Sequence, residues 1–152
     1  MNLPLIKRLL VFSILICFLG FFLSNQERQI LYSIDCGIPF GYDIISAEDT
    51  HSGFHGDGKS FYHFSFSNNR TEQRISASPN WNYGIVPDAV QQYVQNEFSL
   101  LLEDSEFYWL FYDKNNGLYN TESLSDNTYS SNYIIALYIP SARNLYYMSI
   151  DT

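Results

Sequence analysis

The sequence predicts an α+β fold, with a mostly antiparallel sheet of about six strands and one packed amphipathic helix, preceded by an N-terminal membrane helix. Three observations support this. Short runs of apolar, aromatic and β-branched residues alternate with turn sequences, helical spacing of apolar residues occurs once, and an uncharged apolar run lies near the N-terminus. The 152 residues include 46% hydrophobic residues, 13 Tyr and 12 Phe, which suits one folded domain with a tail.

The N-terminal apolar run extends from Leu9 to Leu23 and contains no charge. Lys7 and Arg8 precede it, and polar residues follow at once, as in signal sequences and membrane anchors. The run is short for a bilayer, but no pair of small residues marks a cleavage site at its end. Because the positive flank stays inside, the rest of the chain is expected to be exported.

These features divide the chain into three parts. We expect residues 1–8 to be a short cytoplasmic segment, residues 9–24 a transmembrane anchor or signal sequence, and residues 25–152 an extracytoplasmic α+β domain. The expected location is the plasma membrane, with a single pass and the C-terminal domain outside. Secretion after signal cleavage is the alternative.

The part after Ser24 is acidic. It holds six Lys and Arg against all 16 Asp and Glu, a net charge of −10. Nucleic acid is not an expected partner, because binding it requires a basic face. Cys36 is the only cysteine in this part, so an internal disulfide is impossible, and we expect Cys36 to be a buried small side chain.

Strands are predicted wherever short apolar runs are bounded by turn residues. In "KSFYHFSFS", period-two alternation places Tyr62 and Phe64 on one face and Phe61 and His63 on the other. "EFYWLFYD" reads as a central strand followed by a turn at "KNNG", and the last two runs form a hairpin through "PSAR". The six predicted strands are 29–35, 42–49, 59–67, 106–113, 132–139 and 144–151.

One amphipathic helix is predicted after Pro87. Proline suits the first helical turn, and Asp88 complements the positive end of the helix dipole. Apolar residues then recur at steps of three and four, so the helix should lie across the sheet. They are Val90, Tyr93, Val94, Phe98 and Leu101.

Residues 48–58, "EDTHSGFHGDG", carry the clearest functional signal. The candidate ligands for a metal or small molecule are Asp49, His51, His55 and Asp57, with His63 and Trp81 as secondary candidates. Imidazole and carboxylate groups suit a divalent metal, and a histidine beside an aspartate suits a general base. Glycine and aspartate are also ordinary turn residues, so a structural turn between two strands remains open. No nucleophile and no catalytic residue is identified.

Several segments together resemble a family of small secreted or membrane-anchored proteins of Gram-positive bacteria. They are "DTHSGFHGDG", Trp81 with "IVP" before a helix, "FYWLFYD" and the closing "NYIIALYIPSARNLYYMSIDT". The resemblance covers roughly Asp49 to Thr152, and Ser52 stands where the family usually has glycine. It implies a bacterial cell-surface setting and supplies no activity.

The sequence therefore leaves two functions open. The first is a membrane-anchored extracytoplasmic protein, with a binding or accessory domain at the bacterial cell surface and a cell-surface protein or glycan as partner. The alternative is a metal-dependent hydrolase or metal-binding protein that uses the loop 49–58, with a divalent metal as cofactor. Whether the chain is an enzyme stays open.

Overall fold

The computed structural model describes residues 3–23, 25–37, 41–51, 57–98, 107–119 and 132–152. The helices are α1 (Leu3–Leu23), α2 (Gln26–Ser33), α3 (Arg70–Ala77) and α4 (Asp88–Phe98). The strands are β1 (Tyr42–Asp49), β2 (Gly58–Phe66), β3 (Asn82–Gly84), β4 (Phe107–Asp113), β5 (Tyr133–Ile139) and β6 (Asn144–Asp151). The predicted α+β class with a six-stranded antiparallel sheet is confirmed.

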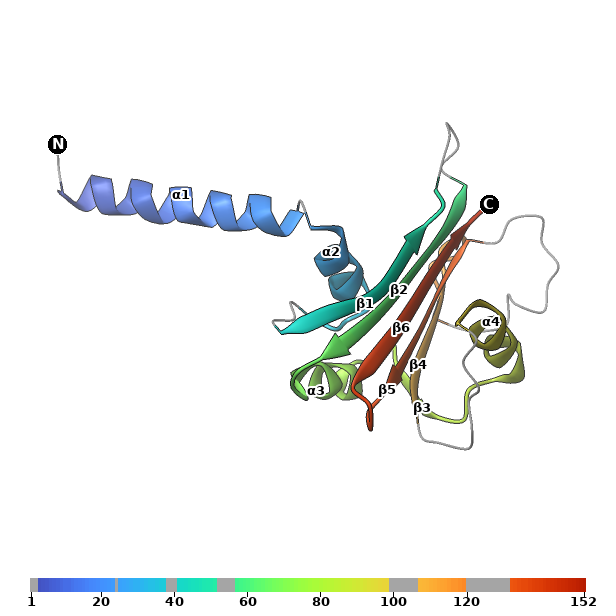
Figure 1. Ribbon diagram of the computed structural model, residues 1–152. Helices are drawn as coiled ribbons and strands as arrows, with labels where there is room; N and C mark the ends of the chain where they lie inside the picture. The colour runs from blue at the N-terminus through green and yellow to red at the C-terminus, as the bar shows by residue number, and fades with distance from the viewer. Residues whose placement is uncertain (1–2, 24, 38–40, 52–56, 99–106, 120–131) are drawn as a thin grey trace.

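The six strands form one sheet in the order β1-β2-β6-β5-β4-β3 (Figure 1). The loop after β1 joins two antiparallel neighbours, and β5 and β6 form the expected hairpin. The pairing of β2 with β6 brings the C-terminal strand into the middle of the sheet. β4 pairs on both sides, with β5 and with the short β3.

The strand predicted at residues 29–35 is wrong, because this segment lies largely in helix α2. Asn25 caps the helix, and its Oδ1 accepts a hydrogen bond from the Arg28 amide at 2.9 Å. Ile30, Leu31 and Ile34 are then brought together at one-turn spacing and buried. The sixth strand is instead β3, which has only three residues.

The prediction of one packed helix is also wrong, because α2 and α3 pack on the sheet as well as α4. In α3, Thr71 and Ile75 are buried four residues apart, while the other side chains of this helix are polar or small. So short an apolar stripe gives little helical signal in the sequence. The predicted α4 is confirmed from Asp88 to Phe98; Leu101 lies outside the described residues.

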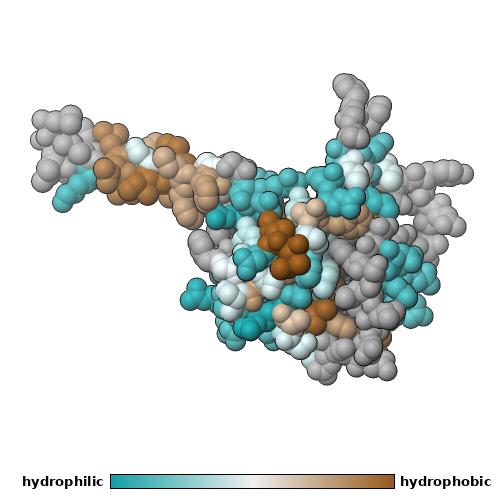
Figure 2. Space-filling model, in the orientation of Figure 1, coloured by the Kyte–Doolittle hydropathy of each residue, from teal (hydrophilic) through white to brown (hydrophobic). Residues whose placement is uncertain are grey.

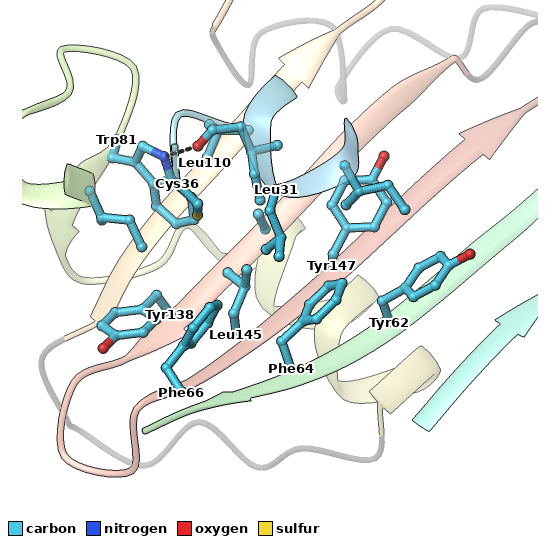
Figure 3. Close-up of a cluster of buried hydrophobic side chains, with 14 residues drawn as sticks. Leu31, Cys36, Tyr62, Phe64, Phe66, Trp81, Leu110, Tyr138, Leu145 and Tyr147 are labelled. Atoms are coloured by element: carbon cyan, nitrogen blue, oxygen red, sulfur yellow. Dashed lines mark hydrogen bonds between the residues drawn. The ribbon is translucent and has the colours of Figure 1, made fainter. Parts of the chain in front are cut away.

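Helices cover both faces of the sheet, which gives two layers of buried side chains. On the α2 face, residues of β2, β5 and β6 pack beneath α2 and Trp81 (Figure 3). Tyr62, Phe64 and Leu145 belong to this layer. On the α4 face, Val90 and Val94 contact residues of β4, β5 and β6.

Cys36 is buried in the α2-face layer, as predicted, and burial raises the pKa of its thiol well above the ordinary value. A thiol held protonated in this way is a poor nucleophile.

Helix α1 projects away from the domain (Figure 1). Its large apolar side chains from Leu9 to Phe21 are 49–65% exposed. None of the described helices is by itself long and apolar enough to cross a membrane. The stretch Lys7–Phe21 and α2 reach that length and composition only when they are taken together, and they are bent by 85° at the break between them. The N-terminal membrane helix therefore stays a prediction.

Candidate functional site

The sheet holds His51 at the β1–β2 end through a tight backbone contact. The Thr50 amide donates to the Lys59 carbonyl at 2.8 Å, and the Lys59 amide donates to Thr50 Oγ1 at 2.9 Å. Gly58 lies against the backbone of His51, where a Cβ would stand 2.5 Å from His51 Cα. Only glycine fits such an approach, so Gly58 is required here for space.

Five polar side chains surround His51, and we call the six residues together the His51 cluster. They are Asp49, His51, Ser60, Lys114, Ser149 and Asp151. Asp49 ends β1, Ser60 belongs to β2, Lys114 follows β4, and Ser149 and Asp151 belong to β6. The cluster therefore joins four segments at one end of the α2 face.

His51 makes contacts through both ring nitrogens. Nδ1 lies 2.6 Å from Asp49 Oδ1, and Nε2 lies 3.0 Å from Asp151 Oδ2. Ser60 Oγ is also 3.1 Å from Nδ1. The bond to Asp151 connects residues 100 positions apart in the sequence and links His51, just after β1, to the end of β6.

Lys114, which follows β4, also contacts Asp151. Its Nζ donates to Asp151 Oδ1 at 2.7 Å, to Asp151 Oδ2 at 2.9 Å and to Ser149 Oγ at 2.6 Å. Asp151 thus accepts from both an ammonium and an imidazole.

The geometry indicates a doubly protonated His51. A carboxylate only accepts hydrogen bonds, so contacts from both nitrogens to carboxylates require a proton on each nitrogen. The hydrogen bond to Asp49 raises the pKa of His51, outweighing partial burial, and Asp151 adds to the increase. Hydrogen bonds from the His51 amide and ring lower the pKa of Asp49. For Asp151, partial burial opposes ionisation, but Lys114 and His51 together lower its pKa.

The chemistry of the cluster does not favour a hydrolase. Ser60 and Asp151 contact different nitrogens of His51, but Nδ1 lies closer to Asp49, at 2.6 Å, than to Ser60, at 3.1 Å. With a proton on each nitrogen, His51 has no lone pair to accept the Ser60 proton. Lys114 Nζ donates to both Ser149 Oγ and Asp151, so its contact with Ser149 is that of a donor.

Charge balance also disfavours a cation at this place. Two carboxylates face one imidazolium and one ammonium, so the four groups neutralise one another. Among the described residues, no group of three or more His, Cys, Asp or Glu side chains is arranged to hold a metal ion. The cluster is a set of mutually satisfied ion pairs and hydrogen bonds that connects His51 with the ends of β1, β2 and β6.

Of the predicted site residues that the structure describes, two are brought together. Asp49 and His51 are in contact, whereas Asp57 is exposed and is not part of the His51 cluster. His55 lies outside the described residues.

The secondary candidates are away from the cluster. His63 faces the opposite side of the sheet from Ser60, stacks on Tyr146 with ring centroids 4.3 Å apart, and has its pKa lowered by burial. Trp81 is buried and donates from Nε1 to the Ile34 carbonyl at 2.7 Å (Figure 3). Both side chains have packing roles.

Four members of the cluster were missed by the sequence analysis: Ser60, Lys114, Ser149 and Asp151. A signal exists in the strand alternation. In β2, Ser60 continues the face that holds Tyr62 and Phe64, and in β6, Ser149 and Asp151 continue the face of Tyr147. Polar residues at the end of an otherwise apolar face in two strands mark a shared polar end, once the pairing of β2 and β6 is known.

No protein-family model matches this chain, and no curated protein or solved structure matches it significantly.

Proposed function

We propose that this chain is a membrane-anchored extracytoplasmic protein whose acidic α+β domain is a binding or accessory module at the bacterial cell surface. The observation that carries the proposal is α1. This helix is apolar on every side from Leu9 to Phe21, and its large apolar side chains are 49–65% exposed. A helix that is apolar all round needs an apolar environment, and a bilayer provides one.

The distribution of polarity supports the same arrangement. Brown covers most of the described part of α1, whereas the visible face of the domain is largely teal and white, with brown patches near its centre and lower part (Figure 2). Lys7 and Arg8 precede the apolar part of α1, which favours a cytoplasmic N-terminus and a domain outside. The run is short, and flanking Lys and Arg side chains that extend to the interface offset the mismatch.

A binding role agrees better with the His51 cluster than catalysis does. The cluster neutralises its own charges and leaves no free base or nucleophile within it. The resemblance of residues 49–152 to Gram-positive surface proteins supports the setting, and a cell-surface protein or glycan is the proposed partner class.

The test is fractionation and topology mapping of the full chain expressed in a Gram-positive host. The chain should remain in the membrane after an alkaline wash, and protease added to cells stripped of their wall should digest the domain. The variant Phe12→Arg/Leu15→Arg places two charges in α1, each of which costs about 3 kcal/mol at the centre of a span. It should leave the membrane fraction or fail to be exported.

The matched control is Ile85→Arg/Leu118→Arg, which places the same charges on side chains that are exposed on the domain. It should fractionate as the unaltered chain does. Release of the unaltered chain by the wash, or protection of the domain from protease in stripped cells, would contradict the proposal.

A further inference from the structure

The two edges of the sheet differ in length and exposure. The β3 edge has three residues, which is too short to pair extensively with another strand. The β1 edge has eight, and every residue from Asp43 to Asp49 is exposed. A long exposed edge is a template for an added strand.

The backbone of β1 presents hydrogen-bonding groups to this open side. The Thr50 amide donates to the carbonyl of Lys59 in β2, and Glu48 is in register with Phe61 of the same strand. Because successive residues of an antiparallel strand alternate the direction of their backbone groups, Ala47 and Asp49 direct theirs away from β2. A register shift between Ile44 and Ser46 marks an irregularity in this edge, and the strand is paired with β2 and exposed on both sides of the shift.

The side chains of β1 indicate the chemistry of an added strand. The strand contains three carboxylates, Asp43, Glu48 and Asp49, and no basic residue. Asp49 is neutralised by His51, but Asp43 and Glu48 are exposed. Ile44 and Ile45 are 42% and 59% exposed, which adds apolar area beside the charges.

We infer that the β1 edge docks an extended, basic segment of a partner protein, which adds to the sheet as a seventh strand. This inference rests on the proposed role as a binding module and assigns its site and partner class. Opposite charges across a strand pair are stabilising, and like charges are not. A second copy of β1 would set its own acids against Asp43 and Glu48, so self-pairing is disfavoured.

The experiment uses the full chain, isotope-labelled, in detergent micelles. The probe is a capped synthetic peptide of about ten residues that alternates Lys and Val, the length and pattern of an ordinary strand. Two reference peptides carry Glu in place of Lys, or N-methyl groups on alternate backbone amides of the Lys peptide. The Lys peptide should shift the amide resonances of Ala47 and Asp49 and protect them from exchange, and both references should bind far more weakly.

Two variants localise the site. Asp43→Asn/Glu48→Gln should weaken binding about threefold to tenfold at low salt, from the loss of two cross-strand charge pairs. Ala47→Pro removes an amide that points away from β2, so the fold should persist while binding is lost. The control Glu72→Gln/Asp88→Asn removes the same charge from α3 and α4 and should bind within about twofold of the unaltered chain.

Four outcomes would overturn the inference: no binding, shifts away from β1, equal weakening in the control variant, or concentration-dependent dimers that the peptide disrupts. The last would show that a second copy occupies the edge. Because binding in micelles does not depend on where the cell places the chain, failure here leaves the fractionation test intact, and failure there leaves this one intact.

Discussion

The α2 face of the sheet has two ends with opposite chemistry. Beneath α2, Phe64, Leu145 and their neighbours form an apolar layer. Beyond Tyr62 and Tyr147, the same strands end in the His51 cluster. The apolar part needs only side chains of suitable size and shape, whereas the polar end needs particular donors and acceptors within hydrogen-bond distance.

This difference predicts unequal contributions to stability. Buried apolar side chains leave cavities when truncated, and the cost is large. Ion pairs that remain partly exposed contribute little, because solvent screens them. The His51 side chain is 25% exposed and the Asp151 side chain 34%, so the cluster should fix the position of His51 more than it stabilises the fold.

The largest effect is expected from Leu31→Ala in α2. Leu31 is fully buried, so its truncation should lower the free energy of unfolding by about 3 kcal/mol. Urea titration in detergent micelles, followed by tryptophan fluorescence, measures this change. The control Ile45→Ala alters an exposed side chain and should change stability by less than about 0.5 kcal/mol. Equal losses in the two variants would mean that α2 does not pack on the sheet as described.

An intermediate effect is expected from Gly58→Ala at the polar end. The new Cβ would stand 2.5 Å from His51 Cα and 2.6 Å from His51 N, so the backbone must move at a cost of about 1–3 kcal/mol. In an NMR spectrum, the His51 and Thr50 amide resonances should shift. Gly20→Ala is the control, because nothing lies within 4 Å of its Cβ position. Unchanged His51 and Thr50 amide resonances in Gly58→Ala would show that Gly58 does not lie against the backbone of His51.

The smallest effect is expected from His51→Gln, and it should depend on pH. Because the pKa of His51 is raised in the folded state, His51 contributes stability that is complete below its unfolded pKa of 6.5 and is lost as pH rises through its folded pKa. The lowered pKa values of Asp49 and Asp151 give contributions that are complete above the unfolded value of 3.8 and lost as pH falls through the folded values. Between pH 3.8 and 6.5, the free energy of unfolding of the unaltered chain should therefore exceed that of the variant by at most about 1 kcal/mol. Outside this range the difference should be smaller.

His63→Gln provides the contrast on the other face. Burial lowers the pKa of His63, so protonation at low pH destabilises the folded state, and the variant should gain stability relative to the unaltered chain as pH falls. Urea titrations across the pH range measure both differences. Parallel pH profiles for the two variants would contradict the assigned environments.

The elements with strong periodicity were predictable from the sequence. The alternation of β2, the hairpin of β5 and β6, and the apolar spacing of α4 each span enough residues to identify the element. α2 was mistaken for a strand because its eight residues include the apolar run at Ile30 and Leu31, and its helical state depends on the Asn25 cap and on burial against the sheet.

The candidate site was only half predictable. Asp49 and His51 are two residues apart, so their contact is local. Lys114 and Asp151 reach the cluster only because β4, β5 and β6 are neighbours, a property of strand order that no local pattern contains. Local spacing therefore left a metal site and a structural turn both open, and it could not indicate that Lys114 lies beside Asp151.

The junction between α1 and α2 has a mechanical consequence. α1 ends at Leu23 and α2 begins at Gln26, and the Arg28 guanidinium lies 4.3 Å from the centre of the Phe21 ring. Ile30 and Leu31, one turn further on, are already part of the core. With α1 embedded as we propose, only two residues separate the anchor from a helix that packs into the core, so the domain stays within a thin layer above the lipid headgroups. A ligand must enter that layer to be captured, so a partner confined to the same membrane meets the domain at a far higher effective concentration than one diffusing in bulk.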